Sequence, residues 1–207
     1  MAGDTEEGLR GRFSRVVDVL RGADVDAGEY RPTDHDPLAR FDGATGREVE
    51  RYWLDAPYAF AVITYDDTEN EHRYHLAEPA LDGFRGELLE RVVEDIRDPL
   101  LYRSTDPTEE AALHEELTAL LEQYGADVTP ETFHTLAYYL MRDFRGYGKV
   151  DPLMHDPNVE DISCDGYGLP IFVYHDRYTD VETNISFDRE DLDDYVVKLA
   201  QRSGRHI

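Results

Sequence analysis

The chain has 207 residues and a formal net charge of -25, and 41% of its residues are hydrophobic. This acidic balance argues against nucleic acid as a partner, because binding to phosphates needs a basic face, and against direct docking on an anionic membrane surface. No apolar run approaches the ~18 residues of a membrane-spanning helix. The single cysteine excludes an internal disulfide.

The acidic residues are spread between apolar stripes, and aromatic residues make up 11% of the chain. Disordered acidic tails lack both features, so we predict a folded protein. Arginine far outnumbers lysine, which occurs only at Lys149 and Lys198. Such a surface suits a cytoplasm with molar salt, where the Debye length is about 3 Å and self-repulsion is weak. Because the N-terminus also lacks the apolar core of a signal peptide, we expect a salt-adapted, cytoplasmic protein.

This reading predicts that the melting temperature falls as KCl is lowered from molar to millimolar concentration. Repulsion between carboxylates is screened over a shorter distance at high salt, so the folded state loses stability as the Debye length grows. Thermal unfolding followed by circular dichroism across a KCl series measures the effect. A melting temperature that stays flat over the series would contradict the salt adaptation.

The first 48 residues form an acidic N-terminal segment. One helix is predicted within it, with apolar residues at helical spacing: Phe13, Val16, Val17 and Leu20. The stretch that follows, Gly22–Gly46, is rich in Gly, Pro and Asp and is typical of a solvated loop. We therefore expect most of residues 1–48 to pack loosely.

A first α/β subdomain is predicted for residues 49–128. Two β-branched and aromatic runs, 58–66 and 72–78, flank an Asp/Asn-rich turn and indicate a hairpin. Apolar residues then recur at helical spacing in 82–101 and in 108–124, which predicts two amphipathic helices.

A second α/β subdomain is predicted for residues 129–207. It opens with a helix that is capped by Thr129 and that ends at Gly146-Tyr147-Gly148. Three short strands follow, at 159–164, 170–175 and 180–187. Asp188 caps a last helix, whose predicted buried stripe is Leu192, Tyr195, Val196 and Leu199. The fold class is therefore α+β: a helical and hairpin subdomain, then a small three-stranded sheet flanked by helices.

The sequence Gly146-Tyr147-Gly148-Lys149 brings glycines in front of a lysine, as a phosphate-binding loop does. A P-loop needs two glycines separated by four residues and a Ser or Thr after the lysine, whereas Val150 follows here. We interpret the glycines as a helix stop and, with Pro152, as the hinge on which the strands turn. Gly166-Tyr167-Gly168 is interpreted as a hairpin turn, since glycine supplies positive φ.

Histidine stands beside aspartate at His155-Asp156 and His175-Asp176, but no HExxH or CxxC arrangement accompanies these pairs. We therefore predict no metal site. Cys164 alternates with Ile162 in a predicted strand, which favours a buried structural thiol. No GxSxG and no dinucleotide-binding fingerprint occurs, so the residues on their own indicate no catalytic centre.

The C-terminus carries a small basic cluster of Arg202, Arg205 and His206 after an acidic helix. Two readings stay open. The arginines can pair with nearby carboxylates, or they can contact a phosphate, for which the guanidinium group offers bidentate hydrogen bonds.

Residues 142–166, RDFRGYGKVDPLMHDPNVEDISCDG, resemble the N-terminal module of the archaeal type II/IV secretion ATPases. The resemblance covers about 51–207 and is most specific in 138–207, while the first fifty residues resemble nothing that we can name. Its other parts are APYAFAVITYDD…YHLAEPAL in 56–81, PIFVYH at 170–175, TNISF at 183–187 and LAQRSGRHI at 199–207.

The resemblance implies a hexameric motor in which an N-terminal α/β domain sits over the nucleotide of a RecA-like core. The core carries the P-loop and the acidic metal-binding motifs of that family. This sequence ends at Ile207 without a Walker A or Walker B segment, so we expect a chain truncated before the RecA-like core. No catalytic residue can be carried over, ATP and Mg²⁺ are implied only for the core, and Arg202 and Arg205 are the candidates for a position near the nucleotide phosphates.

The leading hypothesis is therefore the non-catalytic N-terminal part of a haloarchaeal-like secretion, pilus or archaellum ATPase. Its implied partners are its own ATPase core, neighbouring subunits of a homo-hexamer, and a polytopic membrane platform protein that holds it at the inner face of the cell membrane. One alternative is a stand-alone adaptor or regulatory module derived from such an ATPase. Another is a small-molecule sensor, which would need an apolar pocket among the strand aromatics.

Overall fold

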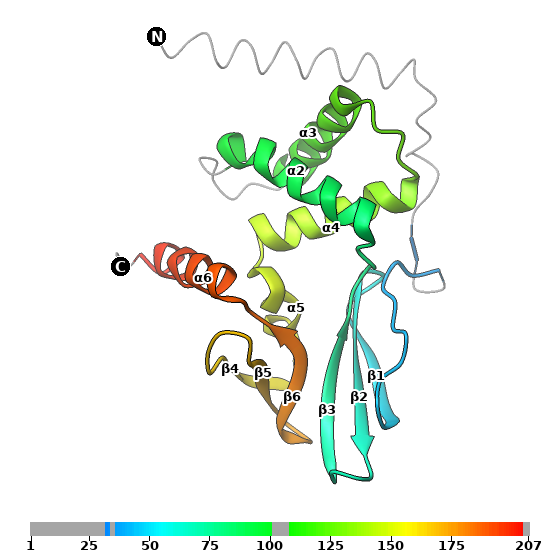
Figure 1. Ribbon diagram of the computed structural model, residues 1–207, viewed down its shortest axis with the longest axis vertical. Coiled ribbons are helices and arrows are strands. Elements are labelled where there is room, and N and C mark those ends of the chain that lie inside the picture. The colour runs from blue at the N-terminus through cyan, green and yellow to red at the C-terminus, as the bar shows by residue number, and fades with distance from the viewer. Residues whose placement is uncertain (1–31, 34–35, 101–107, 205–207) are drawn as a thin grey trace. The chain divides into compact units, whose positions relative to one another are not determined.

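The computed structural model describes residues 32–33, 36–100 and 108–204 (Figure 1). Within these residues the chain forms two compact units. One is helical and spans Leu81–Met141, and the other combines Thr33–Ala80 with the chain from Arg142 onward. Helices and a mixed sheet together confirm the predicted α+β class. The helix expected around Phe13–Leu20 lies outside the described residues.

The second unit is built on one six-stranded sheet with the order β1-β2-β3-β6-β5-β4 (Figure 1). Its strands are β1 (Arg47–Asp55), β2 (Ala59–Asp66), β3 (Glu71–Ala77), β4 (Val159–Ser163), β5 (Pro170–His175) and β6 (Thr179–Ser186). All neighbours are antiparallel except β3 and β6, which run parallel and pair Tyr74 with Thr183. The hairpin and the later strands were expected in separate subdomains, whereas they lie in one sheet.

The predicted hairpin β2–β3 and the three later strands form close to their expected positions. β1 was not predicted. It is an edge strand whose residues are exposed or half-buried, and its sequence, REVERYWLD, mixes charges into the alternation that identifies a strand. Irregular pairing at Glu48/Glu50 and at Trp53/Asp55 is typical of edge strands.

Each face of the sheet carries its own apolar layer. On one face, a row of buried side chains crosses four strands: Ile63, Tyr74, Ile171, Val173 and Val181. The other face is covered at β2 by the segment around Leu38 and Ala39, which are 2% and 3% exposed. Their amides donate to the carbonyl of Pro57 at 3.2 and 3.3 Å. The expectation of loose packing is therefore wrong for this segment, because its apolar residues complete the core cluster with Phe60 and Val62.

The helical unit contains α2 (Gly83–Leu100), α3 (Thr108–Tyr124) and most of α4 (Pro130–Phe144). The local start and stop signals act as predicted. Thr129 Oγ1 accepts the amide of Thr132 at 3.2 Å, which is an N-cap bond. α3 ends before Gly125, whose φ of +63° is accessible to glycine. The buried apolar positions include Leu88, Leu89, Val92, Ile96, Leu113, Leu117, Leu120, Leu121, Leu136, Ala137, Tyr138, Tyr139 and Leu140.

A tight joint connects the end of α4 to the sheet unit. After α4 the chain forms a 3-10 turn, η1 (Gly148–Val150), and then the short helix α5 (Asp151–Met154). Gly148 has a φ of +61°. A Cβ on Gly146 would lie 2.4 Å from Cγ of Asp151 and 2.6 Å from the carbonyl oxygen of Arg142. The two glycines are thus required by the turn itself, and their use as a hinge, with Pro152, stays a prediction.

Replacing Gly146 by Ala is expected to lower the free energy of unfolding by about 1–3 kcal/mol, because the added methyl group overlaps packed atoms. The Asp151 carboxylate cannot simply move, since its Oδ1 accepts the amide of Tyr147 at 2.7 Å. Urea unfolding at constant KCl measures the change. Gly86→Ala is the matched control, since nothing lies within 4 Å of a Cβ there, and it should leave stability unchanged or raise it by about 0.5–1 kcal/mol. Equal midpoints for the two variants would contradict the steric argument.

Two expectations about burial are wrong. Cys164 is exposed, because β4 ends at Ser163 and the thiol already belongs to the turn toward β5. The stripe on α6 (Arg189–Arg202) is only partly buried: Leu192, Tyr195 and Leu199 are half-buried, and Val196 is 46% exposed. Within the unit, no described strand or helix packs extensively along α6. The Asp188 cap is confirmed, since its side chain accepts the amide of Asp191.

Candidate functional site

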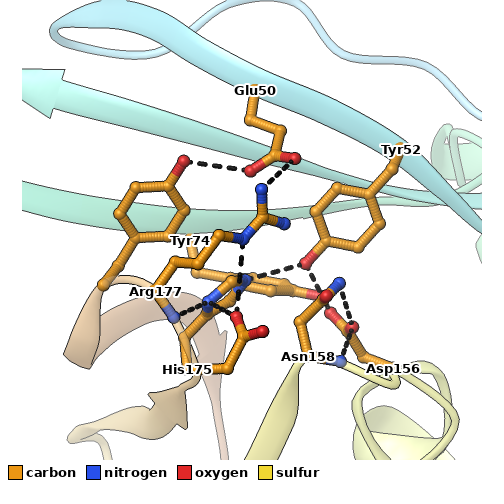
Figure 2. A network of polar contacts seen from close by, with 9 residues as sticks. Glu50, Tyr52, Tyr74, Asp156, Asn158, His175 and Arg177 are labelled. Atoms are coloured by element: carbon orange, nitrogen blue, oxygen red, sulfur yellow. Dashed lines mark hydrogen bonds and ion pairs between the residues drawn. The ribbon is translucent and has the colours of Figure 1, made fainter.

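The most constrained polar group of the sheet unit is the carboxylate of Asp156, which is 4% exposed. Its Oδ2 accepts the hydroxyl groups of Tyr52 and Tyr74 at 2.7 and 2.8 Å (Figure 2). Its Oδ1 accepts the backbone amide of Asn158 at 2.8 Å and the side-chain amide at 3.0 Å. Four donors from three parts of the chain therefore converge on one buried carboxylate. We call Tyr52, Tyr74, Asp156, Asn158 and His175 the Asp156 network.

Local chemistry places Asp156 in the turn between α5 and β4. An aspartate whose side chain accepts the amide two residues on forms an Asx-turn, and Pro157 between the two residues fixes the backbone. The carbonyl of Asn158 accepts the amide of Asp176 at 2.8 Å. The turn is therefore attached to the β5–β6 turn as well as to the two tyrosines.

His175 extends the network from the end of β5, where it is fully buried. Its Nδ1 accepts the backbone amide of Arg177 at 3.2 Å, and its Nε2 lies 3.2 Å from the hydroxyl oxygen of Tyr52. Because Tyr52 donates its only hydroxyl proton to Asp156, these partners assign the imidazole proton to Nε2. The carboxylate of Asp176 lies 2.9 Å from Nδ1 and can accept a hydrogen bond from it only when Nδ1 carries a proton.

Burial shifts the pKa values of these groups. Desolvation lowers the pKa of His175, against the opposing effect of Asp176 and Asp156. Desolvation and the neighbouring Asp156 carboxylate raise the pKa of both Tyr52 and Tyr74 well above the ordinary value. At neutral pH the imidazole and the two phenols are thus neutral, which is the protonation state that the hydrogen bonds require.

Glu50 of β1 forms the outer edge of the site (Figure 2). Its carboxylate binds the guanidinium group of Arg177 at 2.7 Å and the hydroxyl of Tyr178 at 2.9 Å. The ring of Tyr178 packs against His175 and His72, with centroids 4.9 and 4.6 Å apart. These contacts hold the β5–β6 turn against β1. In the sheet, β2 and β3 lie between β1 and β6.

The arrangement acts as a clamp. Tyr52 lies in β1 and Tyr74 in β3, whereas Asp156 precedes β4 and His175 ends β5. The network therefore connects strands β1–β3 to strands β4–β6, which are otherwise joined by a pairing of only two residues between β3 and β6. Among the described residues, no buried side-chain nitrogen or oxygen lacks a hydrogen-bond partner. A fully satisfied buried network restricts the structure to one arrangement.

The predicted site residues lie elsewhere in the unit or outside the described residues. Gly146, Gly148 and Pro152 line the joint that leads through α5 to Asp156. Arg202 is the last residue of α6, and Arg205 lies outside the described residues. Their proposed phosphate contact remains a prediction. In the described part of the chain, no group of three or more His, Cys, Asp or Glu side chains is arranged to hold a metal ion.

Sequence reasoning missed the Asp156 network. It weighed His155-Asp156 and His175-Asp176 only as possible metal ligands. A usable signal was present in β5, where His175 continues the inward-facing alternation of Ile171 and Val173. A polar residue in such a position is buried and needs a partner, but nothing local shows that the partner is Tyr52.

A family model matches part of this chain. Residues 7–80 match the family model described as PilB3-like, N-terminal. The match covers all of β1, β2 and β3. It also covers residues 7–50, which lie outside the region that resembles the secretion ATPases by sequence. The more specific part of that resemblance, 138–207, lies outside the matched range.

Three proteins of Methanocaldococcus jannaschii are similar to this chain, and each carries the name "uncharacterized protein". MJ1288 is 35% identical over 150 residues, which are 70% of this chain and 60% of that protein. MJ0900 is 36% identical over 81 residues, 39% of this chain and 14% of that protein. MJ0781 is 32% identical over 60 residues, 29% of this chain and 8% of that protein. The chain thus spans 60% of the length of MJ1288 and much smaller shares of the other two relatives.

No helix in the described part of the chain is long and apolar enough to cross a membrane. The strands of the matched region are the strands that carry Tyr52, Tyr74 and Glu50, so the family match and the Asp156 network share one sheet. The family match supports the assignment of this region as the N-terminal domain of a pilus or secretion ATPase.

Proposed function

We propose that the chain is the non-catalytic N-terminal part of a type II/IV secretion-system ATPase from a salt-adapted archaeon. In this role it caps the ATP site of a RecA-like core, contributes to hexamer assembly and couples ATP-driven motion to a polytopic membrane platform protein. It would work at the inner face of the cell membrane through that partner. ATP and Mg²⁺ belong to the core, and Arg202 and Arg205 are the proposed contacts to the phosphates.

One observation carries this proposal: the two regions that resemble such ATPases form a single sheet. The family match covers β1, β2 and β3, while the most specific resemblance covers β4, β5 and β6. The parallel pairing of β3 with β6 joins the two groups of strands. Hydrogen bonds of the Asp156 network stabilise this junction. A domain that transmits motion between a core and a platform must move as one body, which a clamped sheet supports.

Affinity capture tests the proposal. The full chain is tagged and recovered from archaeal cells in molar KCl, and bound proteins are identified by mass spectrometry. We expect a polytopic platform protein among the bound proteins and peptides of a RecA-like core in the tagged polypeptide itself. Asp156→Ala should lose the platform protein, and the exposed Asp161→Ala should keep it. Recovery of neither partner by the unaltered chain would contradict the proposal.

The chain alone is expected to hydrolyse no ATP. Phosphoryl transfer requires a P-loop lysine and a Mg²⁺ ion held beside the phosphates, and the sequence contains no Walker A segment. Release of phosphate from MgATP is measured against a reaction without protein. Turnover that disappears in Arg202→Ala or Arg205→Ala would contradict the non-catalytic role.

A second candidate is a separate adaptor or regulator derived from such an ATPase. The match to MJ1288 favours it, because the matched residues make up 60% of that protein, against 14% and 8% of the two others. The capture experiment separates the two candidates. An ATPase core recovered as a distinct polypeptide bound to the chain indicates an adaptor, and a core recovered in the same polypeptide indicates the motor's own N-terminal part.

A further inference from the structure

One side of helix α6 is apolar and open to solvent. Val196 and Val197 are 46% and 45% exposed, whereas Leu153 of α5 in the same unit is 1% exposed. A different side of the helix faces the unit, since the ring of Tyr195 stacks on Phe187 with centroids 4.9 Å apart. Val197 lies about 200° further around the helix than Tyr195. The two valines are therefore not part of the contact that attaches α6 to its unit.

The turn between β4 and β5 extends this open side. It lies close to α6, which follows the end of β6 (Figure 1). Tyr167 of the turn is 45% exposed. It donates its hydroxyl to Asp193 at 2.9 Å, and Cζ of Arg189 lies 4.6 Å from the centroid of its ring. Asp193 precedes Val196 and Val197 by three and four residues, so the three side chains are neighbours on the helix surface. We call Tyr167, Val196 and Val197 the α6 patch.

Contacts on other sides hold α6 in one position on the unit. The side chain of Asp188 caps its first turn. Lys149 of η1 binds Asp191, and Lys198 donates to the backbone carbonyl of Asp143. The α6 patch is therefore preformed, which lowers the entropic cost of binding a partner.

Carboxylates border the α6 patch. Glu190, Asp193 and Asp194 are exposed on the first two turns of α6, and Asp165 is exposed in the β4–β5 turn. They outnumber the guanidinium group of Arg189 at the same end of the helix. The patch thus combines an apolar centre with an acidic border.

This border indicates which kind of partner fits. A second copy of the chain brings the same carboxylates and the same net charge of -25, so like charges would meet across the contact. Nucleic acid and anionic lipid are repelled for the same reason. A protein helix with an apolar stripe between basic side chains matches both features, because the stripe packs on the valines and the basic side chains meet carboxylates.

We propose that the α6 patch binds an amphipathic helix with basic margins from another protein. Apolar anchors at i, i+3, i+4 and i+7 of such a helix pack on Val196 and Val197. Lysine or arginine side chains beside these anchors pair with Glu190 and Asp194. Binding is independent of the ATPase role proposed above, because it requires only α6 and the turn beside it.

Fluorescence polarisation of the full chain with a designed peptide tests the proposal. The peptide has about 18 residues, or five helical turns, with leucines at i, i+3, i+4 and i+7 and arginines on both sides of the stripe. In molar KCl we expect saturable binding. A peptide of the same composition, with its leucines spread around the helix, should bind at least about ten-fold more weakly, since it cannot bury several of them together.

Val196→Asp separates apolar contact from general attraction between charges. It should weaken binding at least about ten-fold, because burial of a valine side chain is worth at least a factor of ten. The added carboxylate would instead tighten a purely electrostatic complex. Val49→Asp is the matched control, since Val49 is 39% exposed on β1 of the same unit, and it should leave the affinity unchanged.

The acidic border is tested at constant net charge. Glu190→Gln with Asp194→Asn should weaken binding about two- to three-fold more than Glu160→Gln with Asp180→Asn, because exposed ion pairs each contribute little. All four carboxylates are on exposed residues, so the two double variants differ in the place of the lost charges. Equal affinities would contradict the pairing of the border with basic side chains.

Hydrogen exchange of the unaltered chain locates the contact without any substitution. Saturation with the designed peptide should slow exchange several-fold in peptides from residues 192–202 and leave peptides from β2 unchanged. Absence of binding, equal affinity for the two peptides, equal affinity of Val196→Asp and Val49→Asp, or unchanged exchange in α6 would each overturn the proposal. So would a dimer of the unaltered chain in sedimentation that Val196→Asp dissociates, since a second copy would then occupy the patch.

Discussion

Replacing Asp156 by Ala is expected to lower the free energy of unfolding by about 3–5 kcal/mol, a large part of the stability of a typical domain. The substitution removes the acceptor for Tyr52, Tyr74 and two groups of Asn158. A buried donor left without a partner costs about 1–3 kcal/mol, and Tyr74 is fully buried. The loss exceeds that of an ordinary surface substitution, which is usually within about 0.5 kcal/mol.

Urea unfolding in molar KCl measures this effect, since urea leaves the ionic strength unchanged. Asp161→Ala on β4 is the matched control, because Asp161 is exposed and its loss should change stability little. Tyr52→Phe and Tyr74→Phe each remove one donor and leave Asp156 with the others, so each should cost less than Asp156→Ala. Their effects should not add, because both hydroxyls share Oδ2. An Asp156→Ala midpoint within error of Asp161→Ala would contradict the clamp.

Local signals were sufficient for most elements of the fold. The hairpin follows from two β-branched runs around an Asp-rich turn, and two helix starts follow from Thr129 and Asp188, whose caps form as predicted. Each of these features is decided by residues within one or two turns of each other. Such signals act at short range, so a single sequence displays them.

The assembly of the sheet could not be predicted in this way. Tyr74 pairs with Thr183, and no pattern within either strand specifies a partner so far along the chain. The same holds for the Asp156 network. The neighbouring His155 suggested a possible metal ligand pair, whereas the hydrogen-bond donors to Asp156 are Tyr52 and Tyr74, which lie in distant strands. Buried polar contacts between distant segments depend on the whole fold.

The stripe on α6 shows a different limit. Its periodicity predicted a buried stripe, but periodicity alone does not say whether an element of the same unit covers the stripe. For Val196 the structure shows no close cover from its unit. Cys164 is a simpler case, since the strand ends one residue earlier than predicted and the alternation that implied burial stops with it.

Stability is expected to fall below about pH 6.5 through His175. Burial lowers the pKa of this imidazole in the folded state, so the unfolded chain binds a proton at a higher pH than the folded one. The contribution of His175 is therefore complete above the unfolded pKa of about 6.5 and is lost as the pH falls from there toward the folded pKa. For one proton the slope is at most about 1.4 kcal/mol per pH unit.

Several charged groups face His175 and set the size of this slope. Asp176 and Asp156 favour the charged ring, as Glu50 does more weakly, while Arg177 and burial oppose it. Burial is the largest of these influences, which fixes the direction. Carboxylates elsewhere also destabilise the protein in acid, and burial lowers the pKa of His75 as well. The effect must therefore be read as a difference between variants.

His175→Gln isolates the effect, because a glutamine amide can donate to Tyr52 without titrating. Urea unfolding of both chains at pH 5 to 8 in constant KCl should give curves that run parallel above pH 7 and converge below pH 6.5, as the unaltered chain loses its advantage. His75→Gln, made as a control, should leave the His175-dependent difference in place. If the unaltered chain and His175→Gln lose stability in parallel over the whole range, the buried imidazole takes no part in the acid response, and the clamp depends on Asp156 and its tyrosines alone.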